Sequence, residues 1–285
     1  MADSVIFDSE EYVEQAYFFR ALSERMGQAM ASQEILESLR EEVLATSKLP
    51  MALAFLSGEL RLHGVMSPAM AKLSHYFTPF QTFVFAEAEE QGGQFDLIVG
   101  LEILRREAEY RARGATPQGI FLYQFESISR NRLNWDRGLT AMAGDPLFDE
   151  PWRQWIIQVR QQLGLIDLVD LIYVRSAYYE QQQAARGKTP EEPLPPVLFG
   201  EKEGRIALAM RHKDPSLLFA SLHRQLGYPE VPVPKSVEED QQRLDQVVRR
   251  LERLEARLKL VEEEQRGGID LERFYEHPDT GSGGS

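Results

Sequence analysis

The runs Gly119-Ile-Phe-Leu-Tyr-Gln-Phe125 and Phe80-Gln-Thr-Phe-Val-Phe85 carry most of the evidence for the fold class. Each is short and rich in aromatic and β-branched residues, which favour strands. Residues 170–174 read as a third, buried strand, and residues 197–200 and 205–210 as the two arms of a β-hairpin. We therefore expect a sheet in the middle and later parts of the chain.

A strong helix signal stands near the N-terminus. Asp8 with Glu11 three residues later has the spacing of a capping box, and Phe7 with Tyr12 has the spacing of a hydrophobic staple. The sequence therefore predicts a helix that begins at Ser9.

Apolar residues at steps of three and four positions indicate further helices. Four helices are expected within residues 8–77, one at about 95–113, one after Asp149 and one after Asp214. Together with the strands, this predicts a helix-rich α+β fold. An N-terminal helical bundle would pack against a mixed α/β region, and a C-terminal coiled-coil helix would follow.

Changes in composition divide the chain. The segment Tyr228-Pro-Glu-Val-Pro-Val-Pro234 holds three prolines, cannot continue a helix and is expected to act as a stiff spacer. The predicted parts are a helical subdomain (1–78), a mixed α/β region (79–228), a proline-rich spacer (229–235), a coiled coil (236–265) and a flexible tail (266–285).

The coiled coil is the sharpest pattern in the chain. In a heptad register from residue 237, seven of the eight core positions are apolar, Asp240 being the exception. The apolar core positions are Val237, Leu244, Val247, Leu251, Leu254, Leu258 and Val261. Arg250 and Arg257 fall opposite Glu255 and Glu262 of a parallel partner, which favours a homodimer. The alternative is a helix that folds back on the body.

Four apolar residues stand close together in the polar tail, namely Ile269, Leu271, Phe274 and Tyr275. Such a cluster can dock as a short peptide in a groove of a partner protein. The alternatives are that it packs on the coiled coil or the body, or that it frays. The final run 281–285 resembles a flexible linker, and whether it is native is open.

Composition excludes several classes of function. The 285 residues include 32 Lys and Arg, 45 Asp and Glu and no Cys, which gives an acidic protein with a formal net charge of −13. Without cysteine there is no disulfide and no thiolate nucleophile. The negative charge disfavours nucleic acid and anionic membranes as partners. An acidic N-terminus without an apolar run predicts a cytoplasmic protein.

Familiar catalytic and nucleotide-binding motifs are missing, so no cofactor is expected. The best candidate for metal binding is Glu59 with His63, because a spacing of four residues places both on one side of a helix. The alternative is that His63 interacts with the C-terminal end of that helix. His212 and His223 could approach one another or a carboxylate, and Asp167 and Asp170 could be paired acids beside the predicted strand. The alternatives are that the histidines lie at the surface and that one of the acids caps or turns the chain.

The leading functional hypothesis is an intracellular oligomerising adaptor or assembly protein. It rests on the coiled coil, because dimerisation gives weak contacts avidity towards a multivalent partner, here an unidentified protein. The alternative is an enzyme of a family that its motifs do not identify, such as a metal-dependent hydrolase, with its site in the α+β body.

Overall fold

The computed structural model describes residues 6–28, 30–90, 95–186 and 195–234, and 70% of these residues are helical. The predicted coiled coil (236–265) and tail (266–285) lie outside the described residues. In the described ranges the helices are α1 (Ser9–Gly27), α2 (Ser32–Glu42), α3 (Leu49–His63), α4 (Ser67–Lys72), α5 (Pro79–Glu89), α6 (Leu97–Ala112), α7 (Pro117–Arg130), α8 (Trp135–Ala143), α9 (Glu150–Gln162), α10 (Leu168–Val174), α11 (Ala177–Ala185), α12 (Glu201–Met210) and α13 (Pro215–Leu226).

The predicted α+β class, with its mixed α/β region, is wrong. Across the described part of the chain there is no strand, and the runs 80–85, 119–125 and 170–174 lie in α5, α7 and α10. The second arm of the predicted hairpin lies in α12. The first arm contributes one isolated bridge, between Ser176 and Phe199.

The error has a physical cause in α5 and α7. Both helices begin with a threonine N-cap followed by proline, and Thr78 and Thr116 each accept a hydrogen bond from the backbone N–H three residues on. These caps satisfy N–H groups that a helix start leaves open. In α7 every residue from Gly119 to Ile128 is buried. A helix buried on all sides loses the 3.6-residue pattern, so its sequence resembles that of a buried strand.

The predicted start of the first helix and its N-cap are confirmed, but the Asp8–Glu11 capping box is not closed. Asp8 is the N-cap of α1 and accepts a hydrogen bond from Glu11 N at 3.0 Å. The rings of Phe7 and Tyr12 meet edge-on with centroids 5.7 Å apart. The Glu11 carboxylate instead accepts from Lys48 N at 3.0 Å, and this links α1 to the start of α3.

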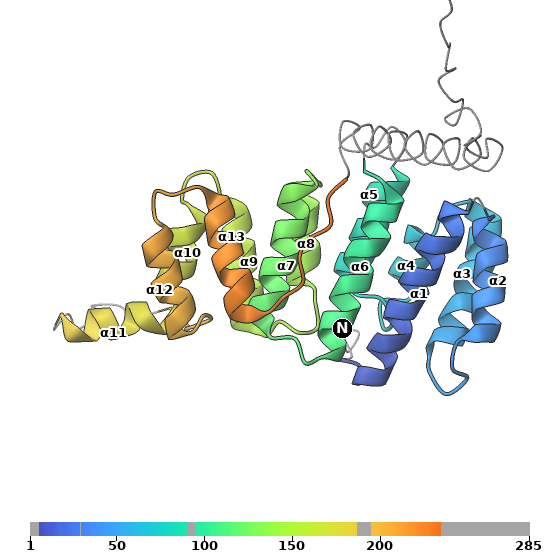
Figure 1. Ribbon diagram of the computed structural model, residues 1–285, viewed down its shortest axis with the longest axis horizontal. Coiled ribbons are helices and arrows are strands. Elements are labelled where there is room, and N and C mark those ends of the chain that lie inside the picture. Colours follow the sequence, from blue (N-terminus) through green and yellow to red (C-terminus); the bar gives the residue numbers. More distant parts are fainter. Residues whose placement is uncertain (1–5, 29, 91–94, 187–194, 235–285) are drawn as a thin grey trace, which may run out of the picture. The chain divides into compact units, whose positions relative to one another are not determined.

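Helices distant in sequence pack side by side around one hydrophobic core. The N-terminal helix α1 lies along α6, with α2 and α3 on its other side (Figure 1). Helix α7 packs against α6, α8 and α13. Helix α13 in turn packs against α12, which contacts both α10 and α11. The described part thus has a central helix, α7, and an edge formed by α2 and α3.

The described part of the predicted spacer lies against the body. Tyr228 is buried, and its hydroxyl donates to Glu126 Oε2 at 2.9 Å. Arg106 donates to the carbonyl of Glu230 at 2.8 Å, and Asn131 donates to the carbonyl of Pro232 at 3.0 Å. Residues 228–234 are therefore tied to α6 and α7. None of the described helices is long and apolar enough to cross a membrane.

Candidate functional site

The structure brings the predicted metal pair together at the end of α3. His63 Nε2 lies 3.7 Å from Glu59 Oε2, while Lys72 Nζ approaches the same oxygen to 2.5 Å. Lys72 therefore supplies the carboxylate with a cationic partner from the protein itself. In the described ranges, no group of three or more His, Asp or Glu residues is arranged to hold a metal ion.

The other candidate residues do not converge on one catalytic centre. His223 meets the ring of Tyr228 edge-on, with centroids 5.2 Å apart. Asp170 forms an ion pair with Arg211 at 2.6 Å. His212 and Asp167 line a separate groove. Of these candidates, His212 and Asp167 line the same groove, and the others lie in other parts of the described fold.

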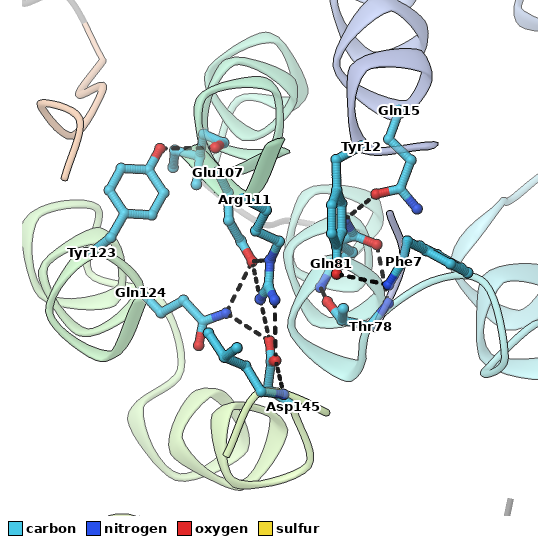
Figure 2. A network of polar contacts seen from close by, with 12 residues as sticks. Phe7, Tyr12, Gln15, Thr78, Gln81, Glu107, Arg111, Tyr123, Gln124 and Asp145 are labelled. Carbon is cyan, nitrogen blue, oxygen red and sulfur yellow. Dashed lines mark hydrogen bonds and ion pairs between the residues drawn. The ribbon is translucent and has the colours of Figure 1, made fainter. Parts of the chain in front are cut away.

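A buried ionic cluster, not predicted from the sequence, connects three parts of the chain (Figure 2). Arg111 of α6 pairs with Glu107 one turn earlier, at 2.6 Å, and with Asp145 after α8. Gln124 of α7 donates to both carboxylates, at 3.1 Å each. All four side chains are buried. Since Glu107 and Arg111 have the spacing of an ordinary surface pair, only their burial distinguishes them.

Burial changes the protonation of this cluster. Desolvation raises the pKa of Glu107, because removal from water penalises the charged carboxylate more than Arg111 favours it. Burial also opposes the charge on Arg111, but Asp145 and Glu107 outweigh that penalty and raise the pKa of Arg111. Glu107 Oε2 is buried and has no hydrogen-bond partner among the described groups. A proton on Glu107 would leave one carboxylate to balance one guanidinium.

A second buried polar contact joins α1 to the segment before α5 (Figure 2). Gln15 donates to the carbonyl of Tyr76 at 3.2 Å and accepts from Gln81 at 3.1 Å. Gln81 also closes the capping box with Thr78. Both sets of buried polar contacts are enclosed in the core. We therefore infer that they fix how the helices pack against one another, and that they do not bind a ligand.

A candidate binding site is an apolar groove of about 320 Å³ near the beginning of α8, α10 and α13. Its aromatic floor contains Phe125, Trp135 and Phe219. The Phe125 ring lies 4.9 Å from Trp135, almost perpendicular to it, and 6.0 Å from Phe219. We call this site the aromatic groove. Its volume is at the lower end of the range for small-molecule pockets.

The rim of the aromatic groove is polar on two sides and apolar beyond them. Asp167 is the last residue of the connection between α9 and α10. His212 and Lys213 lie in the turn before α13. Leu165, which lies in the chain between the lining residues Gly164 and Ile166, is 87% exposed, and Leu217, which precedes the lining residue Leu218, is 48% exposed. Exposed apolar side chains around an apolar groove are typical of interaction sites.

The groove lacks the contacts of a hydrolytic site. Ser129, Asp167 and His212 all line it, but no hydrogen bond or ion pair among the described residues joins any two of them. Nucleophilic catalysis needs a nucleophile and a base within hydrogen-bonding reach. The described residues of the groove therefore show no nucleophile–base pair within hydrogen-bonding reach.

No protein-family model, curated protein or solved structure matches this chain.

Proposed function

We propose that the protein is an oligomerising adaptor whose helical body binds an apolar segment of a partner protein in the aromatic groove. The supporting observation is an apolar groove with aromatic lining residues, next to which Leu165, between the lining residues Gly164 and Ile166 in the chain, is 87% exposed. Covering an exposed leucine with a partner stabilises the complex by about 25 cal/mol per Å² of apolar surface that is removed from water. A partner that covers Leu165 can at the same time place an apolar side chain in the adjacent groove.

The expected partner segment carries a large apolar side chain beside a carboxylate. A groove of about 320 Å³ has room for such an anchor. Anchors of this kind dominate the energy of protein interfaces. Lys213 on the rim forms no ion pair with any described residue, so a carboxylate on the partner can approach it.

Dimerisation through the predicted coiled coil (236–265) is part of this proposal, although it lies outside the described residues. Two grooves on one dimer would bind a multivalent partner with higher avidity than either groove alone. The tail residues Phe274 and Tyr275 remain a second candidate docking segment on sequence grounds. A cytoplasmic location is consistent with a chain that has no cysteine.

A peptide-display selection on the full-length chain tests the groove. We expect selected peptides to combine an aromatic or leucine anchor with an acidic residue. A synthetic peptide of that sequence should bind at least about tenfold more weakly to Leu165→Asp and to Lys213→Glu, as measured by fluorescence anisotropy.

Met51→Asp provides the matched control, because Met51 is 73% exposed and lies on α3, away from the groove. Peptide binding to this variant should equal binding to the unmodified chain. Peptides that bind Leu165→Asp and Lys213→Glu as tightly as the unmodified chain would rule out the groove as the site.

A further inference from the structure

The edge helix α3 has two apolar faces. Its inner face packs in the core through Leu49, Leu53, Leu56 and Leu60. On its outer face Met51 is 73%, Phe55 36% and Leu62 76% exposed. With Gly58 these residues form a continuous stripe at positions 51, 55, 58 and 62, which we call the α3 outer stripe. Steps of four, three and four residues are those of a helix packed against another helix.

The charges of α3 lie at one end of the stripe. Residues 49–58 carry no charge, and the charged groups begin at Glu59. Glu59 pairs with Lys72, and Arg61 pairs with Glu37, so both have partners within the same body. A second helix laid along the stripe would therefore meet an uncharged surface over most of its length.

The spacing of the stripe makes it complementary to itself. Positions 51, 55, 58 and 62 are symmetric about the midpoint between residues 56 and 57. In an antiparallel pair related by a two-fold axis, Phe55 of one copy faces Gly58 of the second copy, and Met51 faces Leu62. A Cβ atom placed on Gly58 would have no neighbour within 4 Å, so the structure leaves room there for an aromatic ring.

A parallel pair fits less well. It would place Phe55 against Phe55, Gly58 against Gly58 and Glu59 against Glu59, which leaves a gap and brings like charges together. The antiparallel pair also sets each helix N-terminus near the C-terminus of the other, where the helix dipoles attract. We propose that the α3 outer stripe is a self-association surface and that its occupant is the α3 helix of a second copy, in antiparallel orientation.

One helix pair buries less than the roughly 800 Å² per partner of a standard interface. The contact is therefore expected to be weak and dependent on concentration. It would act in addition to the predicted coiled coil and does not depend on the aromatic groove. Copies already paired through residues 236–265 would be linked by α3 into larger assemblies.

Chemical cross-linking tests the orientation, because the chain has no native cysteine. The single variants Met51→Cys and Leu62→Cys are each expressed alone and are also co-expressed, so that every chain carries one cysteine. All three samples are treated with a short bismaleimide. The antiparallel pair predicts efficient cross-linking of the co-expressed mixture and little of either variant alone. Efficient cross-linking of each variant alone would overturn the orientation, and no cross-linking in any sample would overturn the proposal.

Sedimentation velocity tests the strength of the contact in the full chain with Leu251→Lys and Leu254→Lys, which remove the predicted coiled-coil pairing. We expect a reversible dimer that grows with concentration. Met51→Asp should weaken it at least tenfold, whereas Leu165→Asp, a change at a side chain that is also largely exposed but lies next to the aromatic groove, should leave it unchanged. A monomer at every concentration, or a dimer insensitive to Met51→Asp, would refute the proposal.

Gly58→Ala separates folding from association. The added methyl group has open space in the single chain, and alanine favours a helix, so the variant should be more stable. In the antiparallel pair the same methyl group meets Phe55 of the second copy. Weaker self-association in a more stable protein is the expected result, and unchanged association would contradict the predicted contact.

Discussion

Helices α7 and α3 are both rich in apolar residues, and both have proline in their first turn, but they differ in how they are covered. Helix α7 packs against α6, α8 and α13 and buries all residues from Gly119 to Ile128. Helix α3 lies at the edge and leaves Met51 and Leu62 largely exposed. Apolar surface on a central helix stabilises the fold, whereas the same surface on an edge helix is available to a partner.

The polar residues of the two helices follow the same division. In α7, Gln124 bonds to Glu107 and Asp145, and Glu126 accepts from Tyr228, all in the interior. Polar groups buried in this way help to specify one packing arrangement. In α3, by contrast, the ionic partners of Glu59 and Arg61 lie at the surface.

The largest expected difference comes from truncating one phenylalanine in each helix. Phe121 is fully buried against Trp155 and Phe199, so Phe121→Ala should lower the free energy of unfolding by about 3–5 kcal/mol. Phe55 is 36% exposed, and Phe55→Ala should cost less than about 1 kcal/mol. Urea unfolding followed by tryptophan fluorescence measures both values. Equal losses would show that α3 is as well covered as α7.

Gln124→Leu probes the polar side of α7. The change removes a donor from two buried carboxylates, so we expect a loss of about 1–3 kcal/mol in the free energy of unfolding. Gln154→Leu is the control, since Gln154 bonds to Glu150 at the exposed surface and its loss should stay within about 0.5 kcal/mol. If both substitutions have the same effect, the cluster does not depend on Gln124.

A pair of glycine substitutions should change stability in opposite directions. In α7, a Cβ on Gly119 would lie 2.1 Å from the Tyr110 hydroxyl, which must then move and give up its bond to the Leu226 carbonyl. Gly119→Ala is therefore expected to lower the free energy of unfolding by about 1–3 kcal/mol. Gly58→Ala in α3 should raise it by about 0.5–1 kcal/mol. Thermal melts of the two variants must move in opposite directions for the comparison to hold.

The smallest expected effect is on the pH dependence of stability, which we compare between the buried carboxyl group of Glu107 and the surface carboxyl group of Glu42. Burial raises the pKa of Glu107, so the folded state holds its proton more tightly than the unfolded state. Its contribution to stability is greatest below the unfolded pKa of about 4.3 and is lost as pH rises through the folded pKa. Glu107→Gln mimics the protonated group. It should therefore remove this pH dependence.

Glu42 at the edge has the opposite behaviour and serves as the control. Hydrogen bonds from Arg25, Ser38 and Tyr17 lower its pKa to about 2. Its stabilising contribution is present above the unfolded pKa and is lost as pH falls towards 2. Glu42→Gln should therefore flatten the acid side of the stability profile, measured by urea unfolding across pH. Profiles that change in the same direction for both variants would contradict the assignment of Glu107.

Local signals in the sequence were sufficient for the ends of several helices. Asp8 and Asp214 cap α1 and α13, and α9 follows Asp149, as predicted, because a helix start depends on a side chain and the backbone a few residues away. The proximity of Glu59 and His63 was predictable for the same reason. In α5 the local signal, Thr78 followed by proline, was present but was outweighed by the aromatic composition of the run.

Features that depend on what covers a residue could be seen only in three dimensions. Residues 119–125 form a helix whose neighbours bury every side, and complete burial removes the periodicity that distinguishes helix from strand. Arg111 and Glu107 resemble a surface pair until Asp145 and Gln124, from other parts of the chain, enclose them. The aromatic groove and the α3 outer stripe likewise arise from the positions of helices in the fold, because neither the depth of a groove nor the exposure of a face is a property of one segment.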